Sequence, residues 1–300
     1  MAYSFLIGNG INRCIDNKYS ADNLIKNLDS ENKEISECKK PFPFPLLFES
    51  LTKQNKESVE THFIKIKDLL KDLNKTKNDI YINNKELLLK ANYIFTTNYD
   101  FSIEESLGIN KELDSIKGNR NSGFKYQLEQ DSAIIYHIHG DLNHYRNICL
   151  GYLGYQKYQR SFFSHVKKDI IKDKYNKERY IPEKLKSFFE DDIYIIGLSL
   201  NECETILWDL LMIRKGLIES GKINENKIIY YDILNQEIDI DINIYIENEK
   251  MLKEFYKSFY IDYECSYVLN DNNENKKENE YKEKYFSIFS EIKEKVEVAI

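Results

Sequence analysis

Short apolar runs that end abruptly at small or polar residues recur along this chain of 300 residues. The five clearest are Ser4–Ile7, Tyr93–Thr97, Ala133–His139, Ile193–Leu198 and Ile228–Asp232. Each run is short enough to be a buried strand, and segments of helical periodicity separate the runs. Strands that alternate with helices form a largely parallel sheet with helices on both faces. The sequence therefore predicts an α/β fold of this kind.

Residues 16–91 interrupt the alternation of strands and helices. Their apolar side chains stand three and four positions apart, as in Phe63, Ile66 and Leu70, which predicts amphipathic helices. We expect these residues to form a helical layer inserted into a single domain that spans residues 1–300.

Residues 236–300 form a C-terminal extension of the predicted strand and helix pattern. Within it, isoleucine occupies every second position from 238 to 246. Because side chains repeat every two residues along a strand, this alternation predicts a half-exposed strand, placed at a sheet edge.

Composition excludes several classes of protein. The formal net charge is −7 and the pI is about 5.5, so the chain lacks the broad positive field with which proteins neutralise phosphates. Direct binding of nucleic acid is therefore not expected. The five cysteines are scattered without paired spacing, which argues against a disulfide framework and against a zinc ribbon.

The N-terminal segment does not have the composition of a secretion signal. The apolar run within Met1–Ile7 is too short for a signal peptide, and glycine and polar residues follow it. No apolar run approaches the roughly 20 residues that span a bilayer. We expect a cytoplasmic protein without membrane contact.

A Gly-Asn-Gly turn follows the first predicted strand. Gly8 and Gly10 would let backbone N–H groups approach a phosphate, with Asn9 between them and Asn12 as the N-cap of the next helix. The third glycine of the dehydrogenase fingerprint is missing, so a hydride-transferring enzyme is not supported. A purely structural role for both glycines is the alternative.

Polar side chains also follow the second predicted strand. Asn98 could hold a ribose hydroxyl or a water molecule, and Asp100 could accept a hydrogen bond from an amide group, with hydroxyl groups at Thr96 and Thr97 before them. Asn and Asp often cap the following helix through Asx turns, which is the alternative.

Two histidines close the third predicted strand. His137 and His139 would share one face, because they are two residues apart. No third and fourth ligand stands at metal-binding spacing, so we expect no metal site. We expect His139, at the open end of the strand, to act as a general base, and His137 to be a hydrogen-bonded core residue.

A turn with one glycine follows the fourth predicted strand. Gly197 would permit close approach of the backbone to a ligand, and Ser199 could bind a ribose or a phosphate or could cap the next helix. Since ligands of parallel sheets collect beyond the carboxyl ends of the strands, all four turns would face one ligand.

Taken in order, the four turns resemble the motifs of the sirtuin superfamily. The motifs are Gly8-Asn-Gly-Ile-Asn12, Thr96-Thr-Asn-Tyr-Asp100, His139-Gly-Asp141 and Gly197-Leu-Ser-Leu200. They are most similar to sirtuin-like bacterial proteins that hydrolyse NAD in antiviral defence. The resemblance covers residues 5 to about 211 and implies a Rossmann-like fold with NAD as substrate.

The resemblance also implies roles for individual residues. Asn98 matches the essential asparagine, Asp100 the acid near the nicotinamide carboxamide, and His139 the catalytic histidine. The glycine turn, with Asn9, Asn12 and Thr97, would contribute to the NAD site. Gly197 and Ser199 match the turn at the adenosine ribose, and Asp232 stands near the adenosine end.

Some family features are missing from this chain. The four-cysteine zinc module of the deacylases is absent, and Asn9, Asn12 and Thr97 replace residues of the deacylase motifs. These differences argue against protein deacylation and leave NAD cleavage. The resemblance further implies a homo-oligomer whose low resting activity is released by assembly, by a nucleotide signal or by a partner such as an ATPase.

Two other functions agree with the same residues. The chain could be a module that binds NAD or ADP-ribose without cleaving it. It could also be a metal-dependent nuclease using Asp100 and Asp141, although these carboxylates do not form a recognisable metal cluster.

Overall fold

A computed structural model gives the arrangement of most of the chain. The residues that it describes are 2–15, 19, 21–28, 43–54, 58–73, 76–109, 115–116, 125–126, 132–143, 148–157, 159, 183–201, 204–236, 242–269 and 274–298.

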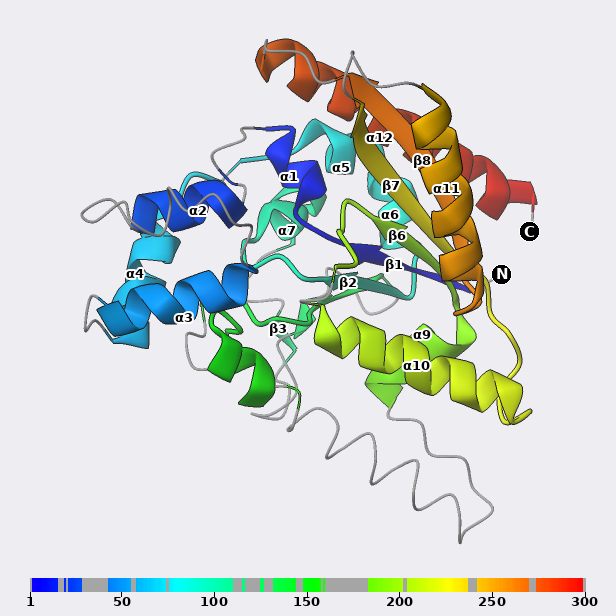
Figure 1. Ribbon diagram of the computed structural model, residues 1–300, viewed down its shortest axis with the longest axis horizontal. Helices are drawn as coiled ribbons and strands as arrows, with labels where there is room; N and C mark the ends of the chain where they lie inside the picture. The colour runs from blue at the N-terminus through cyan, green and yellow to red at the C-terminus, as the bar shows by residue number, and fades with distance from the viewer. Residues whose placement is uncertain are drawn as a thin grey trace, which may run out of the picture.

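The strands of the described residues form one sheet (Figure 1). Its order is β3-β4-β5-β2-β1-β6-β7-β8. The strands are β1 (Tyr3–Ile7), β2 (Tyr93–Thr96), β3 (Ser115–Ile116), β4 (Lys125–Tyr126), β5 (Ile134–His137), β6 (Asp192–Ile196), β7 (Ile228–Gln236) and β8 (Asp262–Leu269). In this order, the six neighbouring strands β5, β2, β1, β6, β7 and β8 are parallel, and β3 and β4 add an antiparallel edge.

The strand order identifies where a ligand would bind. Numbered along the chain, the six parallel strands run 3-2-1-4-5-6, which is the order of dinucleotide-binding Rossmann sheets. The order reverses between the neighbouring strands β1 and β6, and ligands of such sheets bind beyond the carboxyl ends of the strands at this reversal. The predicted α/β fold with a Rossmann-like, mostly parallel sheet is confirmed.

One face of the sheet is covered by helices from the N-terminal part of the chain and by the last helix. They are α1 (Gly10–Arg13), α2 (Ala21–Leu28), α3 (Phe44–Gln54), α4 (Val59–Leu69), α5 (Asp79–Asn83), α6 (Lys85–Leu89), α7 (Ser102–Leu107) and α12 (Glu274–Val298). Phe5 of β1 and Phe289 of α12 belong to the same buried cluster, with Ile66 of α4. The predicted helical character of residues 16–91 therefore agrees with the structure, where it is described.

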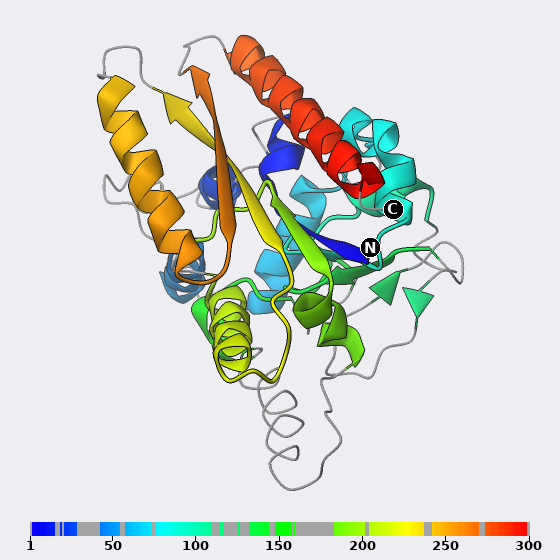
Figure 2. The ribbon, with the colours of Figure 1, turned by 90° about the vertical axis from the view of Figure 1, so that its right-hand side faces the viewer.

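The opposite face is covered by α9 (Glu183–Glu190), α10 (Thr205–Glu219) and α11 (Ile242–Lys257). Leu6, Ile195 and Leu207 belong to the buried cluster on this side. Figure 2 shows β7 and β8 between α11 on one side and α12 on the other.

A buried arginine fixes α10 to the sheet. Arg214 is 0% exposed, and its guanidinium donates to the side chain and carbonyl of Asn226 and to the carbonyls of Phe259 and Tyr260. Because a buried charge needs several partners, these bonds tie the helix firmly to the segments before β7 and before β8.

Two local predictions are wrong. The isoleucine-rich segment does not continue as a strand, because α11 begins at Ile242; residues 238–241 lie outside the described part of the chain. The edge strand of the C-terminal region is instead β8, which pairs with β7 over eight residues. The third predicted strand ends at His137, so His139 lies in the turn that follows.

Among the described residues, none of the helices combines the length and apolar character that crossing a membrane requires.

Candidate functional site

The turns predicted to bind a ligand begin at one level of the sheet. Ile7 is level with Thr96 and Ile196, and Ile196 is level with Tyr231. The next residues along these strands are Gly8, Thr97, Gly197 and Asp232. The structure therefore brings four of the predicted site residues to the carboxyl edge of the central strands.

The glycine turn after β1 packs directly on the turn after β6. Gly8 N–H donates to the Ile196 carbonyl at 3.0 Å, and Gly10 N–H donates to the Gly197 carbonyl at 2.7 Å. A Cβ atom at Gly8 would lie 2.5 Å from the Gly197 oxygen, and one at Gly10 would lie 2.8 Å from it. Close packing of two backbones thus accounts for both glycines. Since both N–H groups are bonded, a phosphate contact here would need other amides of the turn.

The two asparagines near this turn have structural partners. Asn9 is the N-cap of α1, and its Nδ2 donates to the Tyr19 carbonyl at 2.8 Å. Asn12 is inside α1, not at its N-cap as predicted, because the helix begins at Gly10.

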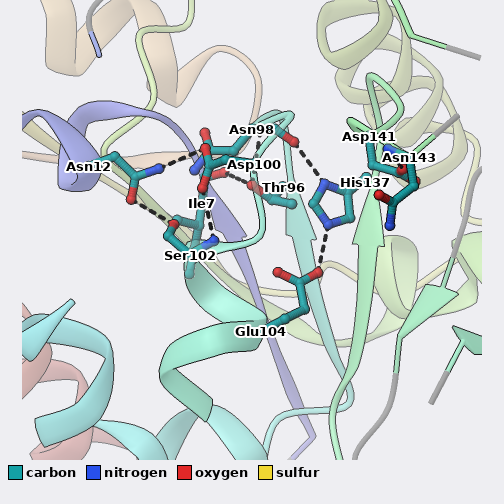
Figure 3. A network of polar contacts seen from close by, with 10 residues as sticks. All are labelled: Ile7, Asn12, Thr96, Asn98, Asp100, Ser102, Glu104, His137, Asp141 and Asn143. Carbon is teal, nitrogen blue, oxygen red and sulfur yellow. Dashed lines mark hydrogen bonds and ion pairs between the residues drawn. The ribbon is translucent and has the colours of Figure 1, made fainter. Parts of the chain in front are cut away.

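Asn12 and Asp100 form a buried network (Figure 3). Asn12 Nδ2 donates to Asp100 Oδ2 at 3.0 Å, and Ser102 Oγ donates to Asn12 Oδ1 at 2.9 Å. Asp100 Oδ1 accepts the Ser102 N–H at 2.9 Å, which is the Asx turn given above as the alternative. Burial raises the pKa of Asp100 above its usual range despite the bonds from Ser102. The network joins the first turn to the second.

His137 is a buried, fully bonded residue, as predicted. It is 0% exposed; its Nδ1 lies 2.8 Å from the Asn98 carbonyl and its Nε2 lies 2.7 Å from Glu104 Oε1 (Figure 3). Burial lowers the pKa of His137, but the charge and hydrogen bond of Glu104 outweigh it, with smaller contributions from Asp141 and Asn98, and raise the pKa to about 9. The imidazolium therefore donates to both partners at neutral pH.

Asn98 is held through its backbone and has an unused side-chain oxygen. Its N–H donates to Thr96 Oγ1 at 3.1 Å, and its carbonyl accepts from His137. Its Nδ2 lies 3.5 Å from the Gly8 carbonyl, and its Oδ1 is buried without a hydrogen-bond partner in the described part of the chain. Buried polar atoms are almost always paired, so Oδ1 is available to a ligand.

His139 lies in a different environment from His137. Its side chain is 2% exposed, with Nδ1 3.4 Å from Tyr155 Oη and Nε2 3.4 Å from Glu204 Oε2. Among the described residues, neither His139 Nε2 nor Glu204 Oε2 has a hydrogen-bond partner. The two histidines thus contact different elements, because β5 stops before His139.

Burial favours the uncharged forms of both groups. It lowers the pKa of His139 to about 4 and raises the pKa of Glu204 to about 8. A neutral imidazole can accept a proton, so His139 is in the form that a general base requires.

The remaining predicted residues lie around this edge. Thr97 is half-buried, and its N–H donates to the Ile7 carbonyl at 3.3 Å. Ser199 is exposed and does not cap α10, whose N-cap is Glu204. Asp232 accepts the Tyr263 hydroxyl at 3.1 Å and lies within β7, which continues beyond the predicted end.

Within the described part of the chain, no group of three or more His, Cys, Asp and Glu side chains is arranged to hold a metal ion.

The sequence interpretation did not assign three residues of this edge. Glu104 contacts His137, and Tyr155 and Glu204 contact His139. Glu204 stands five residues after Ser199 in the last motif, but its contact depends on how the chain turns into α10, which the sequence pattern does not reveal.

Residues 92–209 match the sequence model of a family described as the SIR2-like domain. The matched part begins beside β2 and ends within α10, so it includes Asn98, His139 and Glu204. Among curated proteins, none matches the chain. The family match supports a sirtuin-like domain, which implies NAD binding and is compatible with an NAD-related activity.

Proposed function

We propose that this protein hydrolyses NAD⁺ at the N-glycosidic bond, which releases nicotinamide and ADP-ribose. The observation that carries the proposal is the pair of unbonded, buried atoms, Asn98 Oδ1 and His139 Nε2, beside the strand reversal of a dinucleotide-binding sheet. The SIR2-like match over residues 92–209 supports it.

The buried polar atoms fit a dinucleotide. Asn98 Oδ1 can accept a hydrogen bond from a ribose hydroxyl, while Gly197 and Ser199 would contact the adenosine ribose. Asp232 would stand near the adenosine end. Asp100 has internal partners for both oxygens, so its proposed role is to hold Asn12 and the loop of Asn98 in place.

The chemistry follows from the charge that develops during cleavage. When the bond to nicotinamide breaks, positive charge builds on the ribose carbon, and the site must stabilise this state better than the ground state. Asn98 would orient the ribose or the attacking water. His139, as a neutral imidazole, would accept the proton that the water or a ribose hydroxyl loses.

The proposed biological role is antiviral defence by abortive infection in the cytoplasm. It rests on the resemblance of the four motifs to sirtuin-like defence proteins. An enzyme that depletes NAD must be inactive at rest, so we propose that assembly into a homo-oligomer or contact with a partner such as an ATPase releases the activity.

Nicotinamide release from NAD⁺ by the purified full chain tests the proposal, with and without lysate from phage-infected cells. We expect His139→Ala and Asn98→Ala to lower the rate by about 10²- to 10⁴-fold. Asn27→Ala, on the exposed side of α2, is the matched control and should retain the wild-type rate. Equal rates in all four proteins would reject the proposal. Binding of NAD⁺ without nicotinamide release in any condition would identify a non-catalytic binding module instead.

A further inference from the structure

A second titratable side chain faces the proposed general base. Glu204 Oε2 lies 3.4 Å from His139 Nε2, and neither atom has a hydrogen-bond partner. The contact joins the turn after β5 to the N-terminus of α10.

We propose that Glu204 is a positioning residue that controls proton transfer at His139: its protonated carboxyl group blocks Nε2, and its carboxylate holds the imidazolium that forms during hydrolysis. The inference rests on the proposed NAD⁺ hydrolysis and adds the group that regulates it.

The position of Glu204 is not explained by helix capping. Glu204 is the N-cap of α10, yet its side chain makes no capping bond to the helix. Moving a carboxyl group out of water is costly unless it gains partners, so an unbonded position beside the histidine indicates a use other than stability. The helix itself is fixed by Arg214, so the carboxyl group is presented from a firm support.

The groups around Glu204 are uncharged in the neutral range. Among the described residues, those that face it are His139, Tyr99, Tyr155 and Cys149. Burial raises the pKa of Cys149 to about 12 and the pKa values of both tyrosines well above their usual range. Of this group, Glu204 is therefore the member whose own pKa, about 8, lies near the neutral range, and His139 beside it is a neutral imidazole.

The proton balance of the reaction gives Glu204 its role. The oxygen of water bonds to the ribose carbon as the carbon–nitrogen bond breaks, and that electron pair leaves with neutral nicotinamide. The water proton passes to His139 Nε2, which requires that Glu204 has already lost its own proton to solvent. Its side chain is 14% exposed, against 2% for His139, so it can exchange with solvent. After product release, the imidazolium returns its proton by the same route.

This assignment predicts a pH profile. Burial raises the pKa of Glu204 to about 8, so kcat should increase as pH rises through about 8 in the wild type. In Glu204→Gln, the amide cannot ionise, so kcat should fall by about 10²-fold or more and lose this rise, while the KM for NAD⁺ changes less than threefold. Glu204→Asp should restore part of kcat and the rise with pH.

The experiment measures nicotinamide release from pH 6 to 10 in the purified full chain, with melting curves to show that each variant is folded. Glu219→Gln, at the exposed other end of α10, is the matched control and should keep the wild-type profile. An NMR titration of the His139 ring should also differ between wild type and Glu204→Gln.

The outcomes separate this inference from the proposed function. Wild-type kcat and an unchanged profile in folded Glu204→Gln would overturn the role of Glu204 and leave the hydrolase intact. A wild type that releases no nicotinamide at any pH, with or without infected-cell lysate, would overturn both proposals. Loss of kcat without any change of the pH profile or of the His139 titration would show a structural role and also overturn the inference.

Discussion

His137, the last residue of β5, and His139, in the turn after it, each contact a glutamate, and the two contacts differ in distance, hydrogen bonding and electrostatics. His137 Nε2 and Glu104 Oε1 are 2.7 Å apart, and the second ring nitrogen of His137 bonds to the Asn98 carbonyl. His139 Nε2 and Glu204 Oε2 are 3.4 Å apart and are not hydrogen-bonded. In the first pair both ring nitrogens are bonded and only Glu104 Oε2 has no partner among the described residues, whereas in the second pair the two facing atoms are both without one.

The pKa values of the two histidines differ because only His137 has a glutamate hydrogen-bonded to its ring. Burial lowers the pKa of both rings, but at His137 the charge of Glu104 outweighs burial and the pKa rises to about 9. At His139 burial acts without such an offset, and the pKa falls to about 4. Geometry therefore makes His137 a cation that bonds to the Asn98 carbonyl and His139 a neutral imidazole.

The largest effect is expected from Glu104→Gln, which removes the negative charge that distinguishes the surroundings of His137 from those of His139. The loss of the buried negative charge leaves His137 uncompensated, and we expect the free energy of unfolding to fall by roughly 3–5 kcal/mol below pH 6.5. Because the folded-state pKa of His137, about 9, is above its ordinary 6.5, the stability from the pair is complete below 6.5 and is lost as pH rises through about 9. Urea unfolding at pH 6 and pH 9.5 measures this; an equal loss at both pH values would contradict it.

Glu204→Gln, the same substitution in the second pair, should act in the opposite direction. The folded-state pKa of Glu204 is raised from 4.5 to about 8, so the wild type loses stability as pH rises between these values. The variant avoids this loss, and we expect a gain of roughly 2–4 kcal/mol at pH 8, where the buried amide offsets part of it, and almost none at pH 4.5.

Thermal melts across this pH range test the gain, with Glu219→Gln expected to stay within about 0.5 kcal/mol of the wild type. If Glu204→Gln is less stable than the wild type at pH 8, the carboxylate stabilises the fold through its contacts by more than its burial costs, which contradicts the prediction.

The smallest effect is expected at the exposed end of the edge. Ser199 is exposed, so Ser199→Ala should change the free energy of unfolding by less than about 0.5 kcal/mol. If its hydroxyl bonds the ribose, the KM for NAD⁺ should rise by roughly 3- to 10-fold, which corresponds to one ordinary hydrogen bond. Steady-state kinetics and a melt of the same preparation measure both quantities, and an unchanged KM would remove Ser199 from the site.

The sheet was predictable because its central strands are buried on both faces and are read as short apolar runs. Edge elements gave a weaker signal. β8 mixes charged and aromatic residues. Three of the alternating isoleucines, at 242, 244 and 246, lie in α11, where Ile244 and Ile246 are exposed, so the alternation did not mark the buried face of a strand. The antiparallel strands β3 and β4 have two residues each, too few for a periodicity.

Of the candidate site, the sequence predicted only the residues that directly follow the ends of the parallel strands. Strand ends brought Gly8, Thr97 and Gly197 to one edge, as expected from parallel pairing. His137 and Glu104 are 33 residues apart in the sequence, and His139 and Glu204 are farther apart still. No local sequence pattern therefore reveals these partners. Close backbone packing supports the structural alternative given for Gly8 and Gly10, and their contact with a ligand stays a prediction.

The central position of β1 also determines how this chain must be made. Ser4 pairs in register with Ile193, so β1 meets β6, one of its two neighbours, only after nearly 190 further residues have been added. At about 5–20 residues per second, that is a delay of roughly 10–40 s. During synthesis one edge of this apolar strand therefore stays unpaired until β6 has been made, and pairing over so long a separation is slow.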